Sequence, residues 1–158
     1  MIATADVSDE RMGEVVSLAL QLHDVGGHSA FDGCVRTIRC HRDNGLVKRV
    51  LSTEGRGAVL VIDGGGSLDS ALVGDLIAAA AVSNGWAGII VNGAVRDRHA
   101  IGGLPIGMKA LGFNPQRSTK TSTGELDVPV TVGGVVFEVG KHVWADSDGV
   151  VVELSTGA

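Results

Sequence analysis

VLVIDGGGSLDSALVGDLIAAAAVSNGWAGIIVNGAVRD, residues 59–97, is the stretch of sequence that decides the fold. Short apolar runs at its two ends are typical of buried strands, and the Ala-rich segment 70–86 between them is typical of a helix. Ser67 or Ser70 could cap that helix. Gly74 is a poor residue inside a helix and makes sense if the continuous helix begins near it. The order strand, helix, strand predicts a βαβ unit with a right-handed crossover.

The segments on either side of this unit predict further helices and strands. Before the unit, the patterns predict a helix at 11–20 entered through Ser8 or Asp9, a strand at 34–40 and a short helix at 44–53. After the unit, they predict strand and turn at 104–115, a hairpin of 128–132 with 135–139 through Gly133-Gly134, and a last strand after the turn at 145–149. Residues 1–158 are therefore expected to form a single α/β domain with a mixed sheet and a central βαβ unit, not a pure doubly wound fold.

Composition excludes several classes of function. The 158 residues are 44% hydrophobic, which is typical of a globular domain with a real core. Aromatic residues make up 3% and the formal net charge is -5, so direct binding of nucleic acid is not expected. No apolar run approaches the roughly 20 residues of a membrane span. Cys34 and Cys40 match no zinc motif, and we expect buried thiols in a cytoplasmic protein without a targeting segment.

Two strand ends of the βαβ unit could carry chemistry, because ligands of such sheets bind at the carboxyl ends of strands and at helix N-termini. The glycines of DGGGSL, residues 63–68, fit neither a Walker loop nor a dinucleotide fingerprint, and they read best as a tight turn. The other end, NGAVRD, closes on Arg96 and Asp97. Arg96 offers a planar fork for a carboxylate, and Asp97 offers oxygens suited to Mg²⁺ or Mn²⁺. From spacing alone, a simple ion pair between them is the favoured interpretation.

Gly74 to Ile77 form a second candidate. If the helix begins at Gly74, the free amides of Asp75, Leu76 and Ile77 would face a carboxylate with the helix dipole assisting. The Asp75 side chain, with twenty residues between it and Arg96, could hold a metal-bound water. The alternative is a glycine at position 74 that only permits close helix packing.

The chain resembles the family that contains the regulator of ribonuclease E activity A and the 4-hydroxy-4-methyl-2-oxoglutarate aldolases. The resemblance covers nearly the whole chain and includes the D-x20-R-D pattern of Asp75, Arg96 and Asp97. Besides residues 59–97, the blocks that carry it are TADVSD, GGHSAFDG, CHRDNGLVKRVL, IGMKALGFNPQRSTKT, DVPVTVGGVVFEVG and ADSDGVVV. It implies a swivelling β/β/α domain, a homotrimer with sites between subunits, and a class II pyruvate aldolase.

The resemblance also implies roles for single residues. Gly74, Asp75, Leu76 and Ile77 would hold the pyruvyl part of a small 2-oxo acid through backbone amides. Arg96 would bind the substrate's carboxylate or oxo group, and Asp97 would ligate the divalent metal, Mg²⁺ or Mn²⁺. Cleavage of 4-hydroxy-4-methyl-2-oxoglutarate would then give two pyruvates. Decarboxylation of oxaloacetate would follow through the same pyruvate enolate, with a metal-bound water oriented by Asp75 as general base.

The chain also departs from the aldolase members of that family. Ala100 stands where an acidic residue is common, and we expect a chain that stops at Ala158 to lack the C-terminal carboxylate that larger members supply to a neighbour. Lys109 is not needed as a Schiff base beside a metal, and His99 is explained equally well as a polar loop residue. The second hypothesis is a non-catalytic trimeric regulator that binds ribonuclease E or a related RNA-processing protein. A methyltransferase activity is not supported, since no glycine-rich cofactor loop with its following acid is present.

Overall fold

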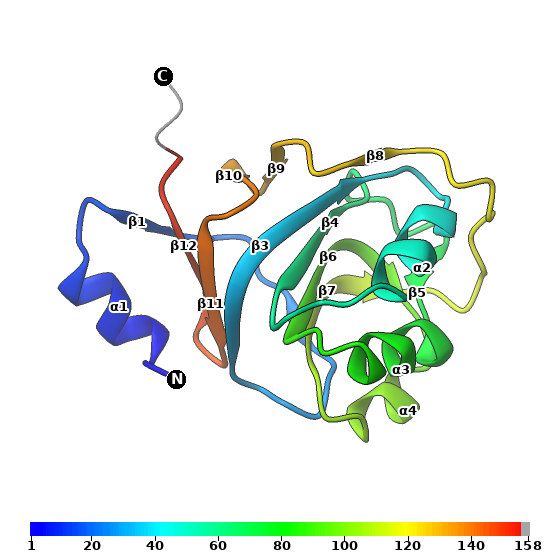
Figure 1. Cartoon of the computed structure of the whole chain (residues 1–158), viewed down its shortest axis with the longest axis horizontal. Coiled ribbons are helices and arrows are strands. Elements are labelled where there is room, and N and C mark those ends of the chain that lie inside the picture. The colour runs from blue at the N-terminus through cyan, green and yellow to red at the C-terminus, as the bar shows by residue number, and fades with distance from the viewer. Residues whose placement is uncertain (156–158) are drawn as a thin grey trace.

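A computed structural model describes residues 1–155 of the chain. Parallel and antiparallel strands form one ten-stranded sheet, and a separate two-stranded hairpin lies beside it (Figure 1). The helices are α1 Thr4–Glu10, α2 Gly45–Leu51, α3 Asp75–Ser83 and α4 Arg98–Gly102. The strands are β1 Val15–Ser17, β2 His23–Asp24, β3 Phe31–Arg39, β4 Val59–Asp63, β5 Ala71–Val73, β6 Gly88–Val95, β7 Gly107–Phe113, β8 Glu125–Leu126, β9 Val130–Val132, β10 Val135–Phe137, β11 His142–Asp146 and β12 Gly149–Glu153.

Strand β3 joins two halves of the large sheet, whose main order is β1-β12-β11-β3-β4-β6-β7-β2. The first residues of β3 pair antiparallel with β11, and residues 35–39 pair parallel with β4. Strands β4, β6 and β7 continue the parallel half, with α2 connecting β3 to β4 and α3 connecting β4 to β6. This is the expected α/β fold with a mixed sheet and a central βαβ unit.

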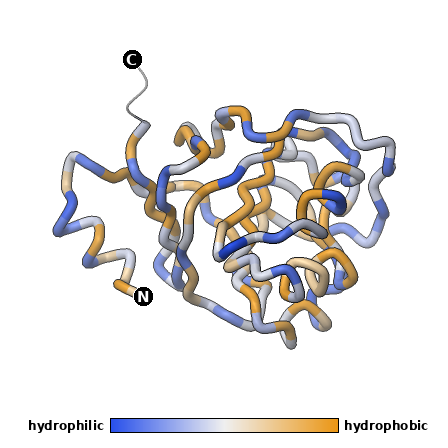
Figure 2. Tube along the Cα trace, viewed as in Figure 1, coloured by the Kyte–Doolittle hydropathy of each residue, from blue (hydrophilic) through white to orange (hydrophobic). Residues whose placement is uncertain are grey.

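The sheet has an apolar core on each face. On one face, Leu60, Ile62 and Ile89 pack against the apolar sides of α2 and α3. On the other face, Val61 and Ile90 pack against the β9–β10 hairpin and strands β11 and β12. The hydropathy trace shows the same division, with the most apolar segments in the inner strands and polar segments in the outer loops (Figure 2). Within residues 1–155, no helix is long and apolar enough to cross a membrane.

Two expected helices differ from the structure. The predicted helix at 11–20 is wrong: the helix is α1, which ends at Glu10, and Val15–Ser17 form strand β1 against β12. The predicted helix at 70–86 begins only at Asp75, because residues 71–73 form β5 beside β6. Gly74 is its N-cap, as its low helix propensity predicted.

The two cysteines differ in environment. Cys40 is buried, and this burial together with the nearby Asp43 and Asp63 raises the pKa of its thiol to about 12. Cys34 is exposed, so the expectation that both thiols are buried was wrong for it.

Candidate active site at the start of helix α3

The carboxyl end of β6 and the first turn of α3 meet in space. Strand β5 pairs parallel with the end of β6, which places Val73 opposite Val95. The Arg96 amide then donates to the Val73 carbonyl at 3.0 Å. These contacts bring Arg96 and Asp97 directly against Gly74 and Asp75, which begin the helix.

Asp97 caps helix α3 from outside the helix. Its Oδ2 accepts a hydrogen bond from the Asp75 amide at 3.0 Å, and its own backbone is left-handed, with φ 59°. That backbone bond is the main cause that lowers the pKa of the Asp97 carboxyl. Partial desolvation opposes the effect, and the Asp75 side chain and the Arg96 guanidinium add to it. The Asp97 side chain is therefore an anion held at a helix N-terminus, the end of the helix dipole that favours negative charge.

Gly74 is the contact point of the site. A Cβ atom at position 74 would lie 2.9 Å from Asp97 Oδ2 and 3.4 Å from Arg96 Nε. Its φ of -121° is open to any residue, so the reason for glycine is the close approach of these two side chains.

Arg96 and Asp97 do not pair with each other. In residues 1–155, no carboxylate oxygen lies within ion-pair distance of the Arg96 guanidinium, and its Nη1 donates to the Pro115 carbonyl at 3.3 Å. The simple ion pair that spacing suggested is absent. Pro115 was not predicted as part of this site, although the turn signal Asn114-Pro115 marks a loop at the end of β7.

The first turn of α3 keeps two free donors. A helix leaves its first amides without intrahelical partners. The Asp75 amide is used by Asp97, whereas the amides of Leu76 and Ile77 have no acceptor among the residues that the structure describes. The Leu76 side chain is 82% exposed, and the Ile77 side chain is buried in the core. Two amides at the start of α3 are therefore left without an acceptor among the described residues, as at helix N-termini that bind anions.

The donors present fit a hydrated Mg²⁺ or Mn²⁺ ion. The side chains of Asp97 and Asp75 lie together here and supply carboxylate oxygens. No cluster of three or more His, Cys, Asp or Glu side chains within residues 1–155 is arranged to hold a metal. Mg²⁺ keeps several waters and takes one or two protein carboxylates, so two carboxylates suit it, whereas a closed zinc site needs four ligands.

Three other residues named from the sequence lie away from this contact point or at its edge. Ala100 and His99 are exposed on α4, the short helix that begins after Asp97. Lys109 is only 3% exposed and its Nζ donates to Asp24 at 2.8 Å. Lys109 pairs with Ile90, whose side chain faces the β9–β10 side of the sheet. Lys109 thus points away from α3, which agrees with the view that it has no covalent role.

Known proteins resemble the chain over nearly its whole length. The family model described as RraA-like, Aldolase/RraA, matches residues 4–152. The RNA-processing inhibitor RraA of Thermus thermophilis is 42% identical, with a TM-score of 0.94, over 100% of this chain and 96% of that one. A Geobacillus kaustophilus HTA426 structure named S-adenosylmethionine: 2-dimethylmenaquinone methyltransferase is 41% identical, with a TM-score of 0.95, over 98% and 97%. Streptomyces coelicolor RraAS2, described as an unusual member of the RNase ES inhibitor RraA family, is 27% identical, with a TM-score of 0.76, over 96% and 78%.

Proposed function

Because this chain belongs to the RraA-like family, we propose that it is a cytoplasmic, divalent-metal-dependent aldolase that cleaves 4-hydroxy-4-methyl-2-oxoglutarate to two pyruvates, with secondary oxaloacetate decarboxylase activity. One observation supports this proposal above the others. An ionised Asp97, the Arg96 guanidinium and two free helix amides converge on Gly74. A regulator that only docks on a partner has no need for this combination of groups.

The chain's own residues would bind the 2-oxo acid end of the substrate. The amides of Leu76 and Ile77 would receive the carboxylate at the positive end of the α3 dipole. Arg96 would exchange its 3.3 Å contact with the Pro115 carbonyl for the 2-oxo oxygen, where it stabilises the negative charge that develops when the carbon–carbon bond breaks. Both contacts fix the substrate in one orientation, which lowers the entropic part of the barrier.

Asp97, through Oδ1, would hold the divalent cation, with Asp75 beside it. The cation, when bound, supplies Lewis-acid stabilisation of the same developing charge. Asp75 would orient a water that takes the proton from the 4-hydroxyl group as the bond between C3 and C4 breaks. One pyruvate leaves directly, and the remaining enolate takes up a proton to give the second. Loss of CO₂ from oxaloacetate gives the same enolate, which accounts for the secondary activity.

Pyruvate release is the test of this function. It should be measured from 4-hydroxy-4-methyl-2-oxoglutarate and from oxaloacetate, with Mg²⁺, with Mn²⁺ and with a chelator. The wild-type chain should require the cation, and Asp97→Ala should lose at least about 100-fold, the scale of removing a charge-stabilising group. Glu54→Gln, which alters an exposed carboxylate of the loop before β4, should keep wild-type activity. Failure of the intact chain on both substrates with both metals would refute the proposal.

A regulator of RNA processing is the second candidate, because the 42% identical Thermus thermophilis protein is named as an RNA-processing inhibitor. We would then expect the chain to bind a ribonuclease E-type protein and to slow its cleavage of RNA. Asp97→Ala separates the two functions, because it should abolish pyruvate release and leave such docking unchanged. The methyltransferase name of the Geobacillus protein suggests a third assay, but residues 63–68 lack the glycine pattern of a nucleotide-binding loop.

A further inference from the structure

A polar groove lies at the carboxyl ends of β3, β4 and β7, outside the contact point of Gly74 and Asp97. Its volume is about 790 Å³, within the usual range for small-molecule sites. Its lining within residues 1–155 consists of polar and charged side chains. The residues that matter to its chemistry are His41, Arg42, Ser70, Asn114, Arg117 and Thr119.

Two guanidinium groups from separate segments give this groove its charge. Arg42 follows β3, and Arg117 lies in the loop after β7. Among the residues that the structure describes, Asp69 is the one carboxylate lining the groove; it is exposed and lies 4.0 Å from Arg42, at the limit of an ion pair. Among residues 1–155, Arg117 has no carboxylate within ion-pair distance. Two guanidinium groups that line one groove are suited to a doubly charged oxyanion, because its oxygens can accept hydrogen bonds from both.

The backbone around Arg42 is held in an unusual conformation. Its φ of 56° is left-handed, a region that side chains other than those of Asn and Asp seldom adopt. Its carbonyl accepts from both the amide and the hydroxyl of Thr119, at 3.0 and 3.2 Å. Glycine would adopt this backbone conformation at a lower conformational free energy than arginine does. Residues held in sparsely populated backbone conformations are frequent at ligand sites.

The walls of the groove are joined beneath the arginines. The Ser118 hydroxyl lies 2.7 Å from the Ser70 hydroxyl and donates to the Ala71 carbonyl. The buried Asp43 accepts from the hydroxyls of Thr119 and Thr121, each at 2.7 Å. These bonds fix the loop after β7 against the segment that follows β3 and against the start of β5. The backbone that carries the two arginines is therefore held in place before any ligand binds.

We propose that this groove is a second binding site, for the doubly charged oxyanion group of a small molecule, either a phosphate or a dicarboxylate. It shares no residue with Gly74–Ile77, Arg96 or Asp97. The same loop nevertheless touches both places, because Pro115 accepts from Arg96 and Arg117 lines the groove. A ligand bound in the groove would therefore affect the loop that contacts Arg96.

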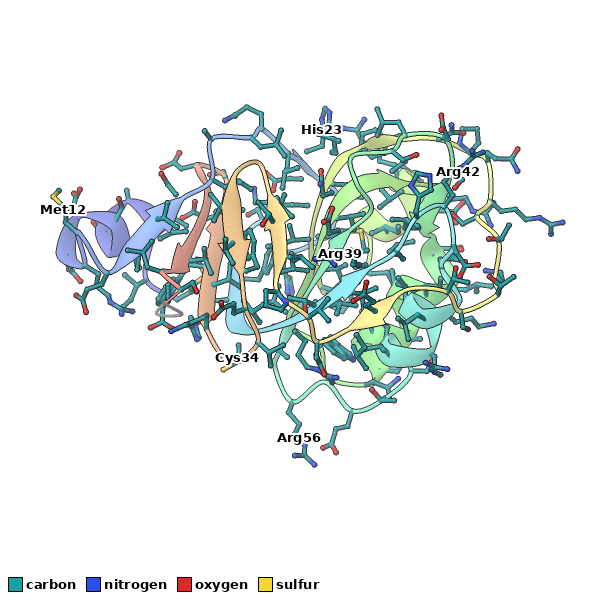
Figure 3. All side chains as sticks on the ribbon, turned by 90° about the horizontal axis from the view of Figure 1, so that it is seen from above. Met12, His23, Cys34, Arg39, Arg42 and Arg56 are labelled. Atoms are coloured by element: carbon teal, nitrogen blue, oxygen red, sulfur yellow. The ribbon has the colours of Figure 1, made fainter. Side chains whose placement is uncertain are left out.

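Titration followed by amide NMR shifts tests the site with two probes, inorganic phosphate and succinate, against chloride at constant ionic strength. Saturable shifts should centre on residues 41–42, 69–70 and 116–119. Arg42→Gln and Arg117→Gln should each weaken binding about tenfold or more, as expected for a lost charged hydrogen bond. The matched control is Arg56→Gln, because Arg56 is also exposed, also has a left-handed backbone conformation and lies far from Arg42 (Figure 3). This variant should bind the probes like the wild type.

Each outcome decides the matter. Tighter binding of phosphate would assign a phosphorylated ligand, and tighter binding of succinate a dicarboxylate. Absence of saturation with both probes up to tens of millimolar would overturn the proposal, as would equal weakening in Arg56→Gln. Shifts centred on residues 74–77 and 96–97 and lost in Arg96→Gln would place the anion in the candidate active site instead. Arg42→Gln and Arg117→Gln are independent surface changes, so a folding defect in one leaves the other as the test.

Discussion

Gly74 makes the sharpest prediction for a single residue. The alanine of Gly74→Ala would bring its Cβ 2.9 Å from Asp97 Oδ2, so the carboxylate must leave the Asp75 amide. We expect pyruvate release to fall about 10- to 100-fold, because small misplacements of catalytic groups cost on this scale. The free energy of unfolding should change by no more than about 1 kcal/mol, the usual effect of changing an N-cap residue.

Steady-state kinetics of Gly74→Ala, with chemical denaturation beside them, check this expectation. Gly103→Ala is the control, since a Cβ there meets only an ordinary 3.5 Å contact and the residue ends α4. Unchanged activity in Gly74→Ala would show that the Asp97 carboxylate is not needed where the structure places it.

Asp43 gives a prediction for stability against pH. Burial opposes its ionisation, but hydrogen bonds from Thr121, Thr119 and Gly45 outweigh burial and hold the pKa of its carboxyl well below the usual range. A carboxyl whose pKa is lowered by folding contributes stability above the unfolded pKa of about 3.9, and this is lost as pH falls further. Asp43→Asn should therefore destabilise the fold by at least about 2 kcal/mol at pH 7, the value of a charged hydrogen bond or more.

Urea unfolding of the wild type and Asp43→Asn at pH 7 and at pH 3 measures this contribution. The difference in free energy of unfolding between the two proteins should be smaller at pH 3. Asp148→Asn, at an exposed turn, should differ little from the wild type at either pH. A difference for Asp43→Asn that stays constant between the two pH values would contradict the assignment.

At the scale of elements, one aromatic ring determines how three parallel strands approach each other. Phe31 of β3 covers Gly88 of β6 and Gly107 of β7, where an added Cβ would come within 2.2 and 2.0 Å of the ring. Gly107→Ala should destabilise the fold by about 1–3 kcal/mol through overpacking. The double variant Gly107→Ala, Phe31→Leu should be more stable than the sum of its single changes, since the residues are in contact. Strict additivity in thermal unfolding would rule out this packing.

Elements that depend on distant partners could not be predicted from local pattern. The βαβ unit and the β9–β10 hairpin follow from residues close in sequence, and these predictions were confirmed. The helix of the unit was predicted from residue 70, and only the poor helix propensity of Gly74 indicated the observed start. Val15, Val16 and Leu18 fit a helix as well as a strand. Val15 and Val16 pair with β12, more than a hundred residues later, and the Leu18 amide donates to the Val150 carbonyl, so residues 15–17 form a strand. Gly13, with φ 87°, separates this strand from α1.

The candidate site shows the same limit. Spacing brought Asp75, Arg96 and Asp97 to notice, and the structure places them around Gly74. Spacing could not show that Asp97 caps α3 instead of pairing with Arg96, because that depends on the left-handed turn at Asp97. Asp43, Arg42 and the loop after β7 come together only through the tertiary fold, so the polar groove was not predicted.

At the scale of the whole molecule, a large exposed leucine beside the candidate site is a candidate for a contact between subunits. Leu76, on the first turn of α3, is 82% exposed, and Leu68 is 44% exposed. An apolar side chain this exposed next to a polar site can be covered by a neighbouring chain. We propose a second copy of this chain as the partner, in the homotrimer that the sequence resemblance implies, and cyclic assembly would then place Leu76 between subunits.

We therefore predict that light scattering after size exclusion gives three times the mass of one chain, and that Leu76→Lys lowers both this mass and pyruvate release. A lysine introduces a charge that would have to be desolvated between subunits, which costs several kcal/mol when it is unpaired. Met12→Lys is the matched control, because Met12 is 81% exposed at the opposite end of the molecule, beyond α1 (Figure 3). A Leu76→Lys protein that keeps the wild-type mass but loses activity would show that Leu76 contacts the substrate and not a neighbouring chain. Equal loss of mass in both variants would remove α3 from the interface.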